Sequence, residues 1–181
     1  MTIESRAAPP LAAQRILTTI ALVLAILGGL GTVAIMAMIN LDVIGRGAFS
    51  TPLPATAEIV SASIVSIVFL QLPYATASGR AVRSDMVIGR IMARSPRAAL
   101  LMDAMNHLVG TIMLAVLLRY IWPEIESAIA DRETVGLYGV FTLPRWPFVL
   151  AVLAGCIMTC VVYAMLTISL FRMAFQPERH T

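Results

Sequence analysis

The chain has 181 residues, of which 59% are hydrophobic and only 13% are charged. Soluble domains usually contain about 45–50% apolar and about 25% charged residues, so a water-soluble enzyme is excluded because its surface would lack polar cover. Two cysteines exclude a disulfide scaffold, and the high apolar content excludes disorder. The net charge of +3 depends on arginine alone, because the chain has no lysine.

Four stretches of 15 or more residues carry no charged residue. Three of them reach the roughly 20 apolar residues that a helix needs to cross a bilayer, and the other, 104–118, does so when it is extended through Asp103. We therefore predict an all-α integral membrane protein with four transmembrane helices in a single membrane domain. The helices are expected at about 16–41, 57–79, 98–120 and 146–172. The first could be a secretory signal, but its length and the lack of a small-x-small cleavage site favour a retained helix.

The arginines divide unevenly between the two ends of these helices. Nine lie in the N-terminal tail, the loop 80–97 and the C-terminal tail, and four lie at the other end. Cytoplasmic loops of membrane proteins carry the excess of positive residues. We therefore expect both termini and the loop 80–97 in the cytoplasm, and the loops 42–56 and 121–145 in the periplasm.

The loop 80–97 mixes arginines with apolar residues such as Ile88 and Ile91. This pattern favours a short helix in the inner headgroup layer, with Arg90, Arg94 and Arg97 on anionic membrane lipids. A solvated charged loop is the alternative.

Few residues could carry chemistry. Cys156 and Cys160 share a helix face, but they lack further ligands for zinc and are expected to be packing residues. Asp103 and His107 also share a face. They could form a proton-linked pair, but we favour an Asp103 at the headgroup level and a His107 packed against a neighbour.

Small residues recur every four positions on two predicted helices, where they would allow close helix packing. They are Ala21, Ala25 and Gly29 on the first helix and Ala151, Gly155 and Thr159 on the fourth. No helix has a row of acids or a Gly/Pro break at its centre, features that transporters use to bind solutes. The chain is therefore not expected to carry a solute alone.

The helix ends carry a recognisable combination of residues. In chain order these are Asn40, Asp42 and Arg46, then Pro54 and Glu58, then Arg80, Arg83 and Asp85, and finally Thr142, Pro144, Trp146 and Pro147. The combination resembles the small permease subunit of tripartite ATP-independent periplasmic (TRAP) transporters, the DctQ-like family. The family often has His at the position of Ala81, which is a local departure.

The resemblance implies a scaffold subunit in the bacterial inner membrane that is not an enzyme and needs no cofactor. A periplasmic solute-binding protein would capture a carboxylate-bearing solute, and a separate large permease subunit would move it by coupling to a sodium gradient. Nucleic acid is not an expected partner. The resemblance also gives structural or assembly candidates rather than substrate-binding residues. They are Asn40, Asp42, Arg46, Glu58, Arg83, Asp85, Pro144 and Trp146.

Two other functions remain open at this point. A membrane anchor of a respiratory enzyme would need a second haem ligand beside His107, and a small multidrug exporter would need a carboxylate deeper in a helix than Glu58.

At the predicted outer boundary, Arg46 and Glu58 flank a short connection between neighbouring helices. We expect them to form an ion pair that fixes this corner. Two independent charges at the headgroup level, each solvated, are the alternative.

Overall fold

The computed structural model describes residues 12–78, 96–137 and 139–175. Four helices and one two-stranded antiparallel hairpin make up this part of the chain. They are α1 (Ala12–Phe49), α2 (Thr56–Ala77), α4 (Pro96–Ala130), β1 (Thr134–Leu137), β2 (Phe141–Pro144) and α5 (Trp146–Phe175). All four helices are long and apolar enough to cross a membrane, which confirms the predicted all-α membrane fold.

Two helices extend beyond their predicted ends. Helix α1 continues to Phe49 and α4 to Ala130, so the connection after α1 is much shorter than the predicted loop 42–56. The prediction ended each helix where charge begins. Charge marks the edge of the hydrocarbon layer, but a helix can continue into the headgroup region because its backbone remains hydrogen-bonded internally.

The predicted loop 121–145 contains the hairpin, which the sequence analysis missed. Its register pairs Thr134 with Pro144 and Leu137 with Phe141. Gly136 in β1 and Gly139 in the turn both have positive φ, which glycine adopts without steric cost. The predicted interfacial helix falls within 80–97, and of these residues only Pro96 and Arg97, at the start of α4, are described.

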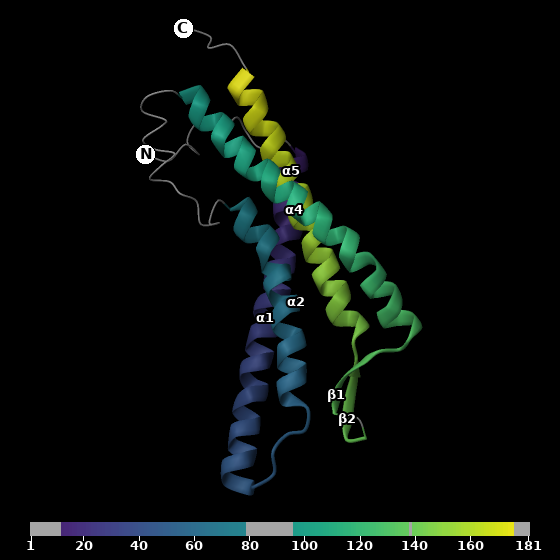
Figure 1. Cartoon of the computed structure of the whole chain (residues 1–181). Coiled ribbons are helices and arrows are strands. Elements are labelled where there is room, and N and C mark those ends of the chain that lie inside the picture. Colours follow the sequence, from purple (N-terminus) through teal and green to yellow (C-terminus); the bar gives the residue numbers. More distant parts are fainter. Residues whose placement is uncertain (1–11, 79–95, 138, 176–181) are drawn as a thin grey trace.

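The helices pack in the order α1, α2, α5, α4, which differs from their order in the chain. Helix α2 packs against both α1 and α5, whereas α4 packs against α5 (Figure 1). One hydrophobic cluster joins the first three of these helices. It is built on Ala21, Met158 and Val162, with Leu17, Leu24, Tyr74, Ala77 and Leu166 around it.

The closest helix contact lies between α2 and α5. Pro73 inside α2 has no N–H, so the carbonyl of Phe69, four residues earlier, lacks its helical donor. Gly155 of α5 lies against this carbonyl, and a Cβ at Gly155 would overlap both Phe69 O and Phe69 C. The missing side chain therefore permits a close backbone approach of the kind expected in membrane helix pairs.

The predicted small-residue faces are only partly correct. Ala21, Gly155 and Thr159 are buried between helices, as expected. Gly29, however, has open space beside it. Gly28 instead faces Gln71 and Ile67 of α2, and Gly31 faces Ile67. The contact face of α1 therefore continues from Ala21 through Gly28 at a seven-residue interval, not at the predicted four-residue interval.

Candidate functional site

Asp42 organises the corner between α1 and α2. It is only 8% exposed, and its carboxylate oxygens accept two hydrogen bonds. Oδ1 accepts from the backbone N–H of Leu53 at 2.8 Å, and Oδ2 accepts from Arg46 Nη2 at 3.0 Å. The corner is tightened further by a hydrogen bond from Thr51 N to Gly45 O. One acidic side chain therefore ties the connecting segment back to α1.

The expected ion pair between Arg46 and Glu58 is not formed among the described residues. Arg46 pairs instead with Asp42, one turn earlier on the same helix. The prediction was wrong because it placed Arg46 beyond the end of the helix. Inside the helix, a residue and its neighbour four positions away lie on one face, so Asp42 is the nearer carboxylate.

The other two corner candidates lie apart from Asp42. Asn40 is exposed, and its Nδ2 donates to Met36 O at 2.7 Å, within its own helix. Glu58 is exposed in the first turn of α2, where the partial positive charge of the helix N-terminus favours an acid. The side chains of Asn40, Arg46 and Glu58 are therefore available at the molecular surface around a fixed Asp42.

A second polar centre ties the hairpin to two helices. The guanidinium of Arg145, just before α5, donates to the carboxylates of Glu133 beside β1 and Glu124 on α4. The backbone N–H of Arg145 also donates to Glu133 O at 2.9 Å. The hydrogen bond to Glu133 is the main cause that raises the pKa of Arg145 above its ordinary value, and both carboxylates add Coulombic attraction.

The predicted candidates Pro144 and Trp146 flank this arginine. Pro144 closes β2 opposite Thr134, and Trp146 begins α5 with 45% of its surface exposed. The hairpin and the corner after α1 lie at the same end of the molecule, the lower end in Figure 1. The structure therefore gathers two groups of candidates at one end of the four helices.

His107 is buried between α4 and α5. Its Nδ1 lies 2.8 Å from Asp103 O and 3.5 Å from Asp103 Oδ1. Its ring packs against Tyr163, with the ring centres 5.5 Å apart, and Gly110 leaves room for this tyrosine. The expectation that His107 packs against a neighbouring helix is confirmed.

The two cysteines also serve the α4–α5 contact. Both are free, and their Sγ atoms lie 3.8 Å from Leu114 O and 3.9 Å from Thr111 O of α4. The described residues contain no group of three or more potential metal ligands. These thiols are therefore packing residues with weak hydrogen bonds, as predicted.

Comparison with known families gives one match. The family described as "Tripartite ATP-independent periplasmic transporters, DctQ component" matches residues 35–173, which is most of the chain. The chain belongs to the DctQ family. No curated protein matches it, and no solved structure does either.

Membership of the DctQ family explains why the chain has four spans and few reactive groups. It is a TRAP transporter small permease component and a multi-pass protein of the inner membrane. The matched range begins just before the α1 corner and includes the hairpin and nearly all of α5. Two of the assembly candidates, Arg83 and Asp85, lie in the range but outside the described residues.

Sequence reasoning missed Arg145 and its two acidic partners in this DctQ chain. It counted Arg145 among the four arginines at one end of the helices and gave Glu124 and Glu133 no role. A useful signal was available, because Arg145 stands between the two candidates Pro144 and Trp146. A single arginine among several acids at the end of two spans is a plausible ion-pair centre.

Proposed function

We propose that this DctQ chain is the static scaffold subunit of a TRAP transporter. It assembles with a large permease subunit and a periplasmic solute-binding protein. The large subunit carries a carboxylate-bearing solute and couples its movement to a sodium gradient. Both termini face the cytoplasm, so the α1 corner and the hairpin face the periplasm.

The proposal rests on the hydrogen bonds that polar side chains make within the membrane spans. Hydroxyl groups along the helices donate to backbone carbonyls three or four residues earlier, as Thr32, Thr76 and Thr167 do. Ser66 also reaches Phe148 O of α5 at 3.0 Å. Among the described residues, no buried side-chain nitrogen or oxygen lacks a partner. Polar groups that are already satisfied do not provide a solute site within the membrane.

The arrangement of the helices supports a scaffold role. The row of helices leaves α1 and α4 at its two edges, where α1 packs mainly against α2 and α4 mainly against α5 (Figure 1). Only 6% of the most apolar window of α1 is buried, and only 11% of that of α4. A large membrane subunit can pack against either edge without disturbing the contacts within this chain.

Uptake measurements in proteoliposomes test the proposal. The small subunit, its large partner and their binding protein are reconstituted together, and each component is then omitted in turn. We expect sodium-dependent uptake only when all three are present. Uptake by this chain alone would overturn the scaffold function, and reporter activity from the periplasm in a fusion at Thr181 would overturn the orientation.

A further inference from the structure

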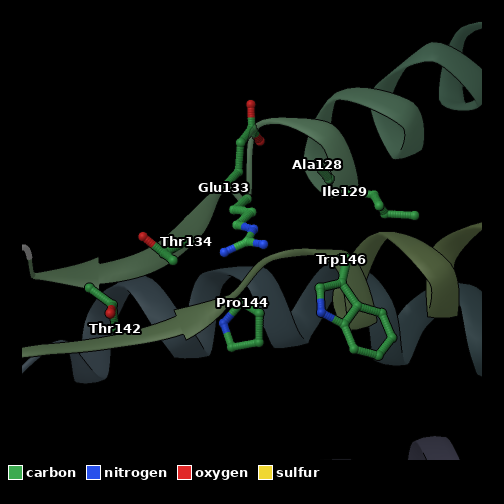
Figure 2. A pocket seen from close by; sticks show the side chains of 8 residues that line it. Ala128, Ile129, Glu133, Thr134, Thr142, Pro144 and Trp146 are labelled. Carbon is green, nitrogen blue, oxygen red and sulfur yellow. The ribbon is translucent and has the colours of Figure 1, made fainter.

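A hollow of about 480 Å³ lies where the end of α4, the hairpin and the start of α5 meet. Its lining consists of Ala128, Ile129, Arg132, Glu133, Thr134, Thr142, Pro144 and Trp146. Figure 2 shows the two threonines on the strands at one side and Trp146 and Ile129 beside the helices at the other. The hollow is therefore polar toward the hairpin and apolar toward the membrane spans.

The polar side offers both signs of charge. Arg132 is exposed and has no ion pair among the residues that the structure describes. Glu133 uses Oε2 to accept from Arg145, and its Oε1 has no partner in the same part of the chain. The hollow thus presents one guanidinium group and one carboxylate oxygen, together with the hydroxyl groups of the strands.

The two threonines belong to one face of the hairpin. Thr134 lies opposite Pro144, and Thr142 lies opposite Gly136, so these four residues share a face because strand side chains alternate. Gly136 adds no side chain to this face. Thr134 and Thr142 can therefore both direct a hydroxyl group to a ligand.

The hollow lies at the level where membrane spans meet the headgroups. Trp146 begins α5, and Trp122 lies near the end of α4, with its Nε1 donating to Glu126 at 2.9 Å. Exposed tryptophans are typical of membrane boundaries, where one end of the ring is apolar and the other is hydrated. Lipid headgroups are therefore expected around this end of α4 and α5.

We propose that the hollow binds one phospholipid with an ethanolamine headgroup. Arg132 and the two threonines bind its phosphate, Glu133 Oε1 accepts from its ammonium group, and an acyl chain lies along Ile129 and Trp146. A purely anionic headgroup fits less well because Glu124, Glu133 and Asp131 are all near. A choline headgroup has no N–H to donate to Glu133.

Native mass spectrometry of the detergent-purified full chain tests this site. The chain is titrated with palmitoyl-oleoyl phosphatidylethanolamine, phosphatidylcholine or phosphatidylglycerol, and in a separate arm with free phosphoethanolamine. We expect one ethanolamine lipid to bind about tenfold more tightly than either other lipid. Phosphatidylcholine has no N–H to donate to Glu133, and the hydroxyl donors of phosphatidylglycerol carry no positive charge. Free phosphoethanolamine binds much more weakly because it has no acyl chain.

Two variants and one control locate the binding. Arg132→Ala weakens binding of the ethanolamine lipid about tenfold, and Thr142→Val, at an exposed position, weakens it less. Arg119→Ala, at an exposed arginine of α4 outside the hollow, leaves it unchanged. Equal effects of Arg132→Ala and Arg119→Ala, or equal binding of all three lipids, would overturn the proposal.

Two further results would also overturn it. Free phosphoethanolamine that binds as tightly as the lipid would indicate a site for a soluble phosphate ester. If Arg132→Ala leaves lipid binding intact but weakens binding of the solute-binding protein, the hollow is a protein-docking site instead.

Discussion

Helices α1 and α5 have the same mean hydropathy of 2.5 over their most apolar windows, yet their burial differs greatly. In α5, 28% of that window is buried, compared with 6% in α1. The lipid is as apolar as a helix surface, so hydropathy places a helix in the membrane without deciding what it packs against. Small residues and satisfied polar groups decide that, and α5 has more of them in contact with its neighbours.

The substitution Gly155→Ala would break the buried side of this comparison. The new Cβ would overlap the backbone of Phe69, which cannot move as a side chain could. Overpacking typically costs about 1–3 kcal/mol of stability, and we expect a loss of at least this size. The loss of stability is measured by unfolding the purified chain in mixed micelles that contain increasing amounts of SDS.

Gly29→Ala is the matched control on α1, because nothing lies within 4 Å of the added Cβ. It should leave stability unchanged or raise it by up to about 1 kcal/mol through helix propensity. Equal losses from Gly155→Ala and Gly29→Ala would show that the α2–α5 contact is not the tight one.

Asp42→Ala tests whether the exposed helix α1 depends on its one buried acid. The change removes the acceptor for Leu53 N–H and the partner of Arg46. We expect a loss of about 1–3 kcal/mol and faster hydrogen exchange at Leu53. The control is Arg46→Ala, which should cost less than about 1 kcal/mol because the Arg46 side chain is 69% exposed. A larger loss from Arg46→Ala than from Asp42→Ala would contradict the central role of Asp42.

Arg145→Ala tests how the start of α5 is held. It removes the side-chain link between Glu133 and Glu124, so the hairpin would be held mainly by its backbone and by its contact with α2. Because the Arg145 side chain is 39% exposed, we expect a loss of about 1 kcal/mol or less. Hydrogen exchange should increase across Thr134–Leu137 and remain unchanged in the middle of α2. Unchanged exchange in the hairpin would argue against an anchoring role for Arg145.

Gly28→Ala should have a smaller effect on the inner side of α1. The added Cβ would lie 2.8 Å from Gln71 Cγ and 3.3 Å from the backbone oxygen of Ile67. The Gln71 side chain can move away, and the Ile67 contact requires a shift of only a few tenths of an ångström. The steric cost is therefore offset by a gain in helix propensity, and the net change should stay within about 1 kcal/mol. The measurement compares SDS unfolding of Gly28→Ala with that of Gly29→Ala, which distinguishes the packed face of α1 from its open face. A loss as large as that of Gly155→Ala would mean that Gln71 is held rigidly.

The smallest expected effect is the coupling between Arg46 and Glu58. Since Arg46 pairs with Asp42, a double-mutant cycle of Arg46→Ala and Glu58→Ala should be additive to within about 0.5 kcal/mol. The cycle is read from SDS unfolding of the purified chain. A coupling well above this value would restore the ion pair that the sequence suggested.

The sequence predicted the four spans because hydropathy depends on local composition alone. It also identified Gly155 and His107 as helix-packing residues. It did not predict the hairpin, since strands of four residues give little periodic signal and the whole segment 121–145 was expected to be a loop. The pairing of Arg46 was wrong because one helix end was misplaced, and the face of α1 was shifted because small residues are common on both sides of it.

The order of the helices has a consequence for how the chain is made. Helices α1 and α2 are neighbours in both sequence and space, and so are α4 and α5, so each pair can form as a hairpin soon after it enters the membrane. The contact between α2 and α5 joins the two pairs, and α5 is the last of the four described helices in chain order. The two halves can therefore unite only after α5 has been synthesised. Two separately expressed halves, divided between α2 and α4, should therefore still assemble through the contact at Pro73 and Gly155.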